Sequence, residues 1–104
     1  MNKVEELRAT FRQEELDDIK EIASSRGGRR FLWRLFSQCN VFSTTFSSDP
    51  YSTAFNEGQR NIGLIVLNDM MQAAPEKFVT AQRGAKEREE RYGRQLAGLS
   101  DSDE

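Results

Sequence analysis

The sequence predicts an all-α protein, a small bundle of three to four helices with extended charged terminal segments. Two observations support this fold class. Apolar residues recur three and four positions apart over most of the chain, which is the spacing of one helix face. The two prolines, Pro50 and Pro75, both stand where a helix can begin, because proline is tolerated in the first helical turn.

The first predicted helix covers residues 2–24, where helix-favouring residues dominate and neither proline nor glycine occurs. Its apolar residues form two sets separated by a phase shift. The shift predicts either a bend near Arg12-Gln13 or two short helices with different partners. The sets are Val4, Leu7 and Phe11, followed by Leu16, Ile19, Ile22 and Ala23.

The second predicted helix covers residues 28–39, after a break over residues 24–28. The break is predicted because the pair Gly27-Gly28 permits left-handed backbone, which ends helices. One wide apolar stripe is expected to face the core. Trp33 lies off that stripe, which consists of Phe31, Leu32, Leu35, Phe36 and Cys39.

A loop rich in serine and threonine is predicted over residues 40–50. We expect its apolar residues Val41, Phe42 and Phe46 to fold it back onto the helices. The third helix, residues 51–73, begins where Asp49 can cap free N–H groups ahead of Pro50. Its two glycines, Gly58 and Gly63, are expected to let another helix approach closely.

The fourth helix is predicted to begin at Pro75. After Gly84 the apolar pattern gives way to charged residues, so this part is either a solvated helix or a segment that orders on a partner. The tail from Gly98 is expected to be disordered. The predicted organisation is an N-terminal helical extension (1–13), a helical core (14–85), and a charged helical extension with a disordered acidic tail (86–104).

The composition argues against several function classes. The chain has no histidine and a single cysteine, Cys39, which removes the commonest general base, an intrachain disulfide and a cysteine zinc site. The adjacent carboxylates Glu14-Glu15 and Asp17-Asp18 point apart on a helix and are expected on a solvated face. The longest apolar run, residues 64–67, is far below the roughly 20 residues of a membrane span. We therefore expect no enzyme activity, catalytic residue, cofactor, metal or membrane partner.

Charge is distributed unevenly along the chain. The net charge is -2, yet residues 25–48 contain four arginines and no acidic residue. In residues 29–34 arginines alternate with aromatic rings, a pattern that can hold phosphates and stack on bases. An amphipathic helix with its arginines in solvent is the favoured interpretation, because helical spacing already accounts for the apolar residues. An exposed Trp33 beside these arginines would suit a protein interface.

A second unusual stretch covers residues 53–63, which is polar and interrupted by glycine. Glycine inside a helix costs about 1 kcal/mol relative to alanine, so close helix packing is the favoured explanation and a ligand site the weaker one. Its polar residues could form a buried network with Arg29 or Arg30. They are Asn56, Glu57, Arg60 and Asn61.

Four segments of the chain resemble a known family. They are residues 28–33 (Gly-Arg-Arg-Phe-Leu-Trp), 39–42 (Cys-Asn-Val-Phe), 45–46 (Thr-Phe) and 53–64. They are similar to a family of small proteins of short-tailed bacteriophages, first described in a Bordetella temperate phage. The similarity covers about residues 16–80 and departs at Gln59, where a basic residue is expected. It implies a gene placed among head and portal genes, and no enzyme activity goes with the family.

The resemblance leads to an expected role as a non-enzymatic virion structural or assembly protein. The expected partners are the portal, the head–tail connector or internal head proteins, contacted by multiple copies in the virion and, during assembly, in the host cytoplasm. A nucleic-acid-binding accessory protein and a regulator of a host protein remain alternatives. The candidate partner-binding residues are Phe11, Arg29, Arg30, Trp33, Arg34, Arg60, Arg88, Arg91 and Tyr92.

Overall fold

The computed structural model describes residues 2–43 and 48–102, and this part of the chain is built from helices without a strand. In chain order the helices are α1 (Lys3–Ala23), α2 (Arg26–Gln38), α3 (Pro50–Ala73) and α4 (Pro75–Ser102). The predicted fold class, a small all-α bundle, is confirmed.

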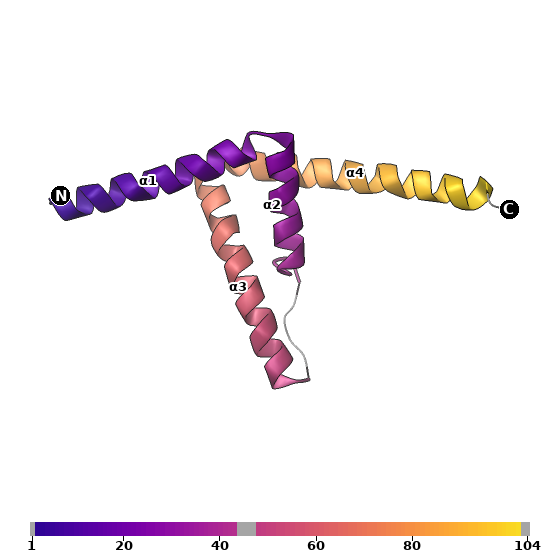
Figure 1. Ribbon diagram of the computed structural model, residues 1–104, viewed down its shortest axis with the longest axis horizontal. Coiled ribbons are helices and arrows are strands. Elements are labelled where there is room, and N and C mark those ends of the chain that lie inside the picture. Colours follow the sequence, from indigo (N-terminus) through magenta and orange to yellow (C-terminus); the bar gives the residue numbers. More distant parts are fainter. Residues whose placement is uncertain (1, 44–47, 103–104) are drawn as a thin grey trace.

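The four helices form a flat T (Figure 1). Helices α1 and α4 make the crossbar and extend in opposite directions, while the antiparallel helices α2 and α3 make the stem. The Cα atoms extend over 72 × 38 × 15 Å with a radius of gyration of 18.5 Å. A compact chain of about 100 residues has a radius of gyration of about 13 Å, so much of each helix lies away from a common core.

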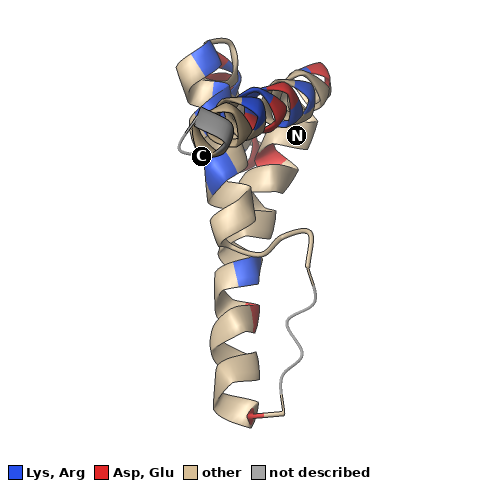
Figure 2. Ribbon diagram, turned by 90° about the vertical axis from the view of Figure 1, so that its right-hand side faces the viewer, with Lys and Arg blue, Asp and Glu red and all other residues tan. Residues whose placement is uncertain are grey.

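The T consists of a central junction, a stem and two arms. The junction is the region where the four helices meet. The N-arm is residues 3–11 of α1 and the C-arm is residues 86–102 of α4. Every described side chain of the two arms is exposed. Figure 2 shows that charged residues gather on the crossbar, while the stem has few.

Local capping explains where three helices begin. The Asn2 side chain accepts a hydrogen bond from the Glu5 backbone N–H (2.9 Å), and the Glu5 carboxylate reaches back to the Asn2 N–H (3.4 Å). Asp49 caps α3 ahead of Pro50, as predicted. Ser25 accepts from the N–H of Gly28 and caps α2. These bonds satisfy N–H groups that have no partner within the helix.

The corner between α1 and α2 differs from its prediction. The break consists of Ser24 and Ser25, and both glycines lie inside the first turn of α2 with ordinary backbone angles. Gly28 is needed for another reason: a Cβ atom there would overlap the carbonyl oxygen of Ile22. The absence of a side chain therefore permits the tight approach of the end of α1 to the start of α2.

The core lies at the junction and is small. Phe36, Leu32 and Met70 are its largest fully buried side chains, supported by Ala23, Val41, Ala74 and Ala81. At Gly63 the end of α2 sits directly on α3, since a Cβ atom there would lie 2.5 Å from Cγ2 of Val41 and 2.6 Å from Cβ of Cys39. The predicted close approach is thus confirmed at Gly63. At Gly58 it is wrong, because no described residue lies within 4 Å of a Cβ atom at that position.

The chain turns back to the core directly after α2. Asn40 adopts a left-handed conformation (φ 57°), and the N–H of Val41 donates to the carbonyl of Phe36 (3.1 Å). Asparagine tolerates this conformation better than most residues. The turn buries Val41 and places Phe42 on Trp33, as expected of these two anchors. The third predicted anchor, Phe46, lies outside the described residues.

The two crossbar helices are more regular than predicted. Helix α1 runs without a break, and its phase shift marks a change of partner: Val4, Leu7 and Phe11 are exposed, whereas Ala23 is buried and Ile19 packs on the core. Helix α4 continues past Gly84 and Gly98 to Ser102, so the predicted disorder from Gly98 is wrong as far as the structure is described. The division into segments at 13/14 and 85/86 stays a prediction.

Candidate partner-binding surfaces

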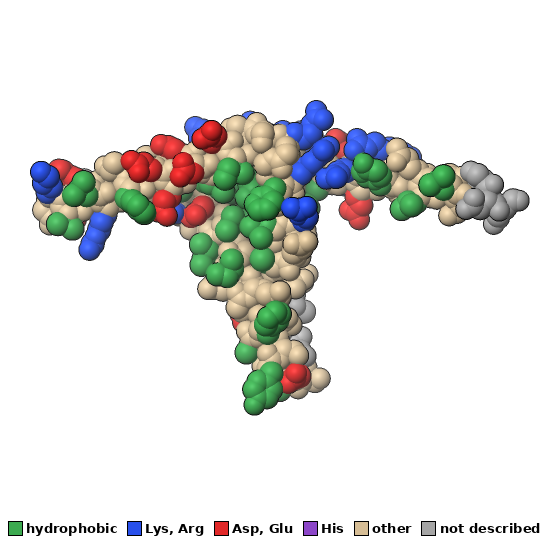
Figure 3. All heavy atoms as spheres, in the orientation of Figure 1, with side chains coloured by type: hydrophobic (Ala, Val, Ile, Leu, Met, Phe, Trp, Pro, Cys, Tyr) green, Lys and Arg blue, Asp and Glu red, His purple; other side chains and the backbone are tan. Residues whose placement is uncertain are grey.

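A basic groove lies between α2 and α4 and has a volume of about 650 Å³. Six arginines line it, and we call it the arginine groove. Figure 3 shows basic side chains gathered where α2 meets the outer half of α4. The arginines are Arg26, Arg29, Arg30 and Arg34 from α2, and Arg88 and Arg91 from α4.

The positive charges of the groove are only partly balanced, because the six arginines share its lining with two acidic residues, Glu87 and Glu89. The ion pairs found among the described residues involve Arg12 and none of the groove arginines. Arg29 donates to the carbonyl of Ala23 (3.1 Å). The pKa of the Arg30 guanidinium is lowered, first by partial loss of hydration and then by the charges of Arg88, Arg26 and Arg91. Arginine nevertheless stays protonated, so the groove is a site for negative charge.

Aromatic rings position several of the arginines. The guanidinium groups of Arg88 and Arg91 lie 5.9 and 5.3 Å from the centre of the Tyr92 ring, and that of Arg34 lies 5.7 Å from the Phe31 ring. Such cation–π contacts hold a guanidinium near a ring face. The prediction that Phe31 is buried is wrong: its side chain is 50% exposed and contacts the guanidinium of Arg34.

Trp33 has a different place from the one predicted. It is half-buried, and its ring lies 5.3 Å from that of Phe42 and 5.8 Å from that of Phe78. Phe42 covers it because the chain turns back at Asn40. Trp33 therefore ties α2 to α4 and forms part of the groove wall, rather than standing free as an interface anchor.

Both arms present apolar side chains to solvent. On the N-arm these are Val4, Leu7 and Phe11, and on the C-arm Tyr92, Leu96 and Leu99, each between 49% and 65% exposed. In Figure 3 hydrophobic side chains are visible on both arms and along the stem, on one face of the molecule. Two candidate contacts, Phe11 and Tyr92, thus belong to these exposed faces. Five further candidates are arginines of the groove, and their side chains are exposed or half-buried. They are Arg29, Arg30, Arg34, Arg88 and Arg91.

The predicted polar network around Arg60 does not form in the described part of the chain. Arg29 and Arg30 belong to the arginine groove, which Arg60 of α3 does not line. Glu57 and Asn61 are exposed, so the expected burial is also wrong. The Nε of Arg60 is buried and has no hydrogen-bond partner among the described residues.

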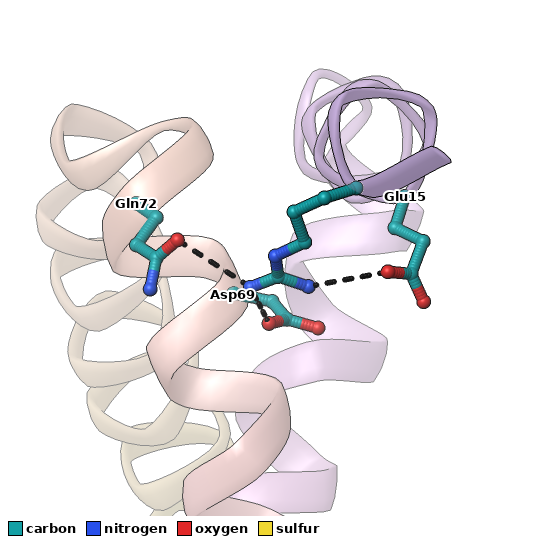
Figure 4. Close-up of polar contacts among 4 residues, drawn as sticks. Glu15, Asp69 and Gln72 are labelled. Atoms are coloured by element: carbon teal, nitrogen blue, oxygen red, sulfur yellow. Dashed lines mark hydrogen bonds and ion pairs between the residues drawn. The ribbon is translucent and has the colours of Figure 1, made fainter. Parts of the chain in front are cut away.

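One polar contact at the junction was not predicted from the sequence. Arg12 of α1 donates to Asp69 of α3 (2.6 Å), with Gln72 at 3.4 Å and Glu15 at 3.6 Å (Figure 4). The hydrogen bond to Asp69 is the main reason that the pKa of Arg12 is raised. No local signal links residues so far apart in the chain. The contact holds α1 against α3 at the inner end of the N-arm.

The described residues contain no group of three or more histidine, cysteine or acidic residues able to hold a metal ion. Among the described residues, no helix is both long and apolar enough to cross a membrane. The carboxylates of α1 (Glu14, Glu15, Asp17 and Asp18) are exposed, as predicted.

These features define a small all-α protein with a basic groove and exposed apolar helix faces. The family described as "Bbp19-like phage protein" matches residues 7–83, so the chain belongs to this family of phage proteins. The resemblance carried by residues 28–64 is thereby confirmed. The C-arm lies outside the matched residues. No curated protein and no solved structure gives a significant match.

Proposed function

We propose that this phage protein is a non-enzymatic structural or assembly component of the virion. It docks in multiple copies on a larger assembly such as the portal, the head–tail connector or internal head proteins. One observation carries the proposal: the described chain exposes apolar helix faces and has a groove lined by six arginines and two glutamates, whose arginines form no ion pair among the described residues. The family membership supplies the phage context.

The exposed faces favour binding to other chains for an energetic reason. Fifteen large hydrophobic residues are exposed among the described residues, while the seven buried hydrophobic residues of the junction core include three alanines. Contiguous exposed apolar surface is uncommon on proteins that act alone and marks interaction sites. Single helices such as the arms are also marginal in water, so a partner that covers them stabilises their structure.

The arginine groove supplies specificity. Six guanidinium groups around one depression favour an acidic partner segment, because arginine pairs with carboxylates through two parallel hydrogen bonds. Opposite charge on the partner raises the rate of encounter and disfavours basic competitors. Charge thus selects the partner, and the apolar faces hold it.

The proposal is tested on purified phage particles by quantitative mass spectrometry. A fixed ratio of this protein to the portal protein is expected, near one or a small integer. A chain truncated after residue 85 should keep its junction but enter particles less well. Absence of the full-length protein from mature particles, with its expression confirmed in infected cells, would contradict a virion role.

A second function, binding to nucleic acid, is favoured by the same groove. Arginines can contact phosphates while an aromatic ring such as Tyr92 stacks on a base. Binding through about six phosphate contacts would weaken steeply with salt, because counterions are released. A filter-binding assay at 50 and 200 mM salt tests this function, and an affinity that is weak and independent of salt would exclude it.

A further inference from the structure

The apolar residues of the two arms have matching spacings. On the N-arm, Val4, Leu7 and Phe11 are separated by three and then four residues. On the C-arm, Tyr92, Leu96 and Leu99 are separated by four and then three. One spacing is the reverse of the other. Two helices with reversed spacing align all three residues when they run antiparallel, whereas a parallel alignment brings only two pairs together.

The two arms of a single molecule cannot make this pairing. They leave the junction in opposite directions, and the termini lie at opposite ends of the crossbar (Figure 1). The partner of each arm must therefore come from another molecule. All six side chains are exposed in the isolated chain and are available for such a contact.

We propose that the N-arm of one copy packs antiparallel against the C-arm of a second copy. In this register Val4 faces Leu99, Leu7 faces Leu96 and Phe11 faces Tyr92. The partner is a second copy of this chain, which competes with a docked assembly for the arms and the arginine groove. The inference goes beyond the proposed function because it does not depend on the phage particle.

Charge supports the same alignment. Helix α1 contains four basic and seven acidic residues, a net charge of −3, whereas the arginine groove is net positive, with six arginines and two glutamates. Beyond Phe11 the register brings residues 14–18 of α1, with four carboxylates, to the mouth of the groove of the other copy. Helical geometry then sets Asp17 beside Arg88 and Glu15 beside Lys86. Pairing of two N-arms would instead set these carboxylates against each other.

One position of the register is unfavourable. Glu14 falls opposite Glu89, and two like charges repel. The neighbouring Arg88 and Arg91 reduce this repulsion. The pair also supplies a test of the register, because reversing one of its charges should strengthen the association.

The buried area is sufficient for a stable dimer when both arms pair. Two crossbars aligned antiparallel bring each N-arm beside a C-arm, so both pairings form within one closed dimer. Each pairing covers six half-exposed apolar side chains, on the order of 100 Å² each. Two pairings together cover roughly 1,200 Å², the lower bound of specific protein interfaces.

Disulfide trapping tests the register in the full-length chain. All variants carry Cys39→Ser, which removes the single native cysteine. A chain with Leu7→Cys is mixed with a chain with Leu96→Cys under mild oxidation, and a mixed disulfide is expected, since facing positions lie within bonding distance. The matched control pairs Phe11→Cys with Leu99→Cys, which the register keeps two helical turns apart. Preferential linkage of Leu7→Cys chains to one another would overturn the proposal.

Light scattering tests the oligomer and its charge pairs. The wild-type chain is expected to have the mass of two chains at about 100 μM. The variants Glu15→Lys and Lys86→Glu should each raise the dissociation constant roughly three- to tenfold, and their combination should restore it. The variant Glu14→Lys should lower it. A wild-type monomer, or a dimer unaffected by these changes, would overturn the proposal. Particle incorporation is a separate readout, so either proposal can fail without the other.

Discussion

The junction and the arms are built from the same kind of helix, yet different forces hold them. At the junction Phe36, Leu32 and Met70 are fully buried and contributed by two helices. On the arms every described side chain is exposed. The N-arm is supported by local capping such as the Asn2–Glu5 pair and, at its inner end, by the contact of Arg12 with Asp69. The junction is thus stable through tertiary packing, whereas the arms rely on local helix stability, which is marginal for isolated helices in water.

The largest effect is expected from a cavity at the junction. Phe36→Ala removes a fully buried ring and should lower the free energy of unfolding by about 3–5 kcal/mol. Phe55→Ala, at a phenylalanine that is 66% exposed on the stem, should change it by less than about 0.5 kcal/mol. Urea unfolding followed by circular dichroism gives both values. Equal losses would show that the core is not confined to the junction.

Substitution of two glycines of α3 by alanine should change the free energy of unfolding by smaller amounts and in opposite directions. Gly63→Ala forces a methyl group against Val41 and Cys39, and should lower the free energy of unfolding by about 1–3 kcal/mol. The methyl group of Gly58→Ala meets no described residue within 4 Å. This variant should raise the free energy of unfolding by up to about 1 kcal/mol, because alanine favours the helix. Thermal unfolding of the two variants is the measurement. Stabilisation by both would mean that α2 does not sit on α3 at Gly63.

The tie between arm and junction is expected to contribute less. Arg12→Ala removes the hydrogen bond to Asp69, so α1 should open more often. Amide hydrogen exchange in α1 should become roughly two- to fivefold faster, while exchange in α2 stays unchanged. Arg8→Ala, at an exposed arginine of the N-arm, is the matched control. If both variants behave alike, the contact with Asp69 does not hold the arm.

The smallest effect concerns pH. The pKa of Asp49 is lowered by hydrogen bonds from the hydroxyl of Ser52 (2.8 Å) and the N–H of Tyr51 (3.2 Å). A carboxyl with a lowered folded pKa stabilises the protein above its ordinary pKa, near 3.9, and loses this contribution as the pH falls through the folded value. In Asp49→Asn the side chain can still cap the helix but no longer ionises. The thermal unfolding midpoint of this variant should therefore depend less on pH between about 2 and 4 than that of the wild type. If the unfolding midpoint of Asp49→Asn depends on pH as strongly as that of the wild type, the Asp49 carboxylate does not contribute to stability in this way.

Local signals explain why the helices could be predicted from the sequence. Asp49-Pro50 and Pro75 mark helix starts through capping and fixed backbone angles, and the structure places α3 and α4 accordingly. The ends were less predictable. Gly98 does not end α4, because a glycine inside a helix lowers its stability without terminating it.

The spatial arrangement needed information that no local pattern contains. Trp33 lies off the apolar stripe of its own helix, and only the left-handed turn at Asn40 brings Phe42 over it. The sequence indicated the part of the arginine groove that α2 contributes, because residues 25–48 contain four arginines and no acidic residue. That Arg88 and Arg91 complete it follows from the path of α4 past α2.

The flat T also affects how the protein moves in solution. A compact protein reaches a radius of gyration of 18.5 Å only at about 270 residues. A monomer of this chain will therefore diffuse more slowly than its 11.9 kDa suggests, and will elute from a sizing column ahead of globular standards of equal mass. Its elution volume alone would resemble that of an oligomer, so its association state must be measured as a mass and not as a size.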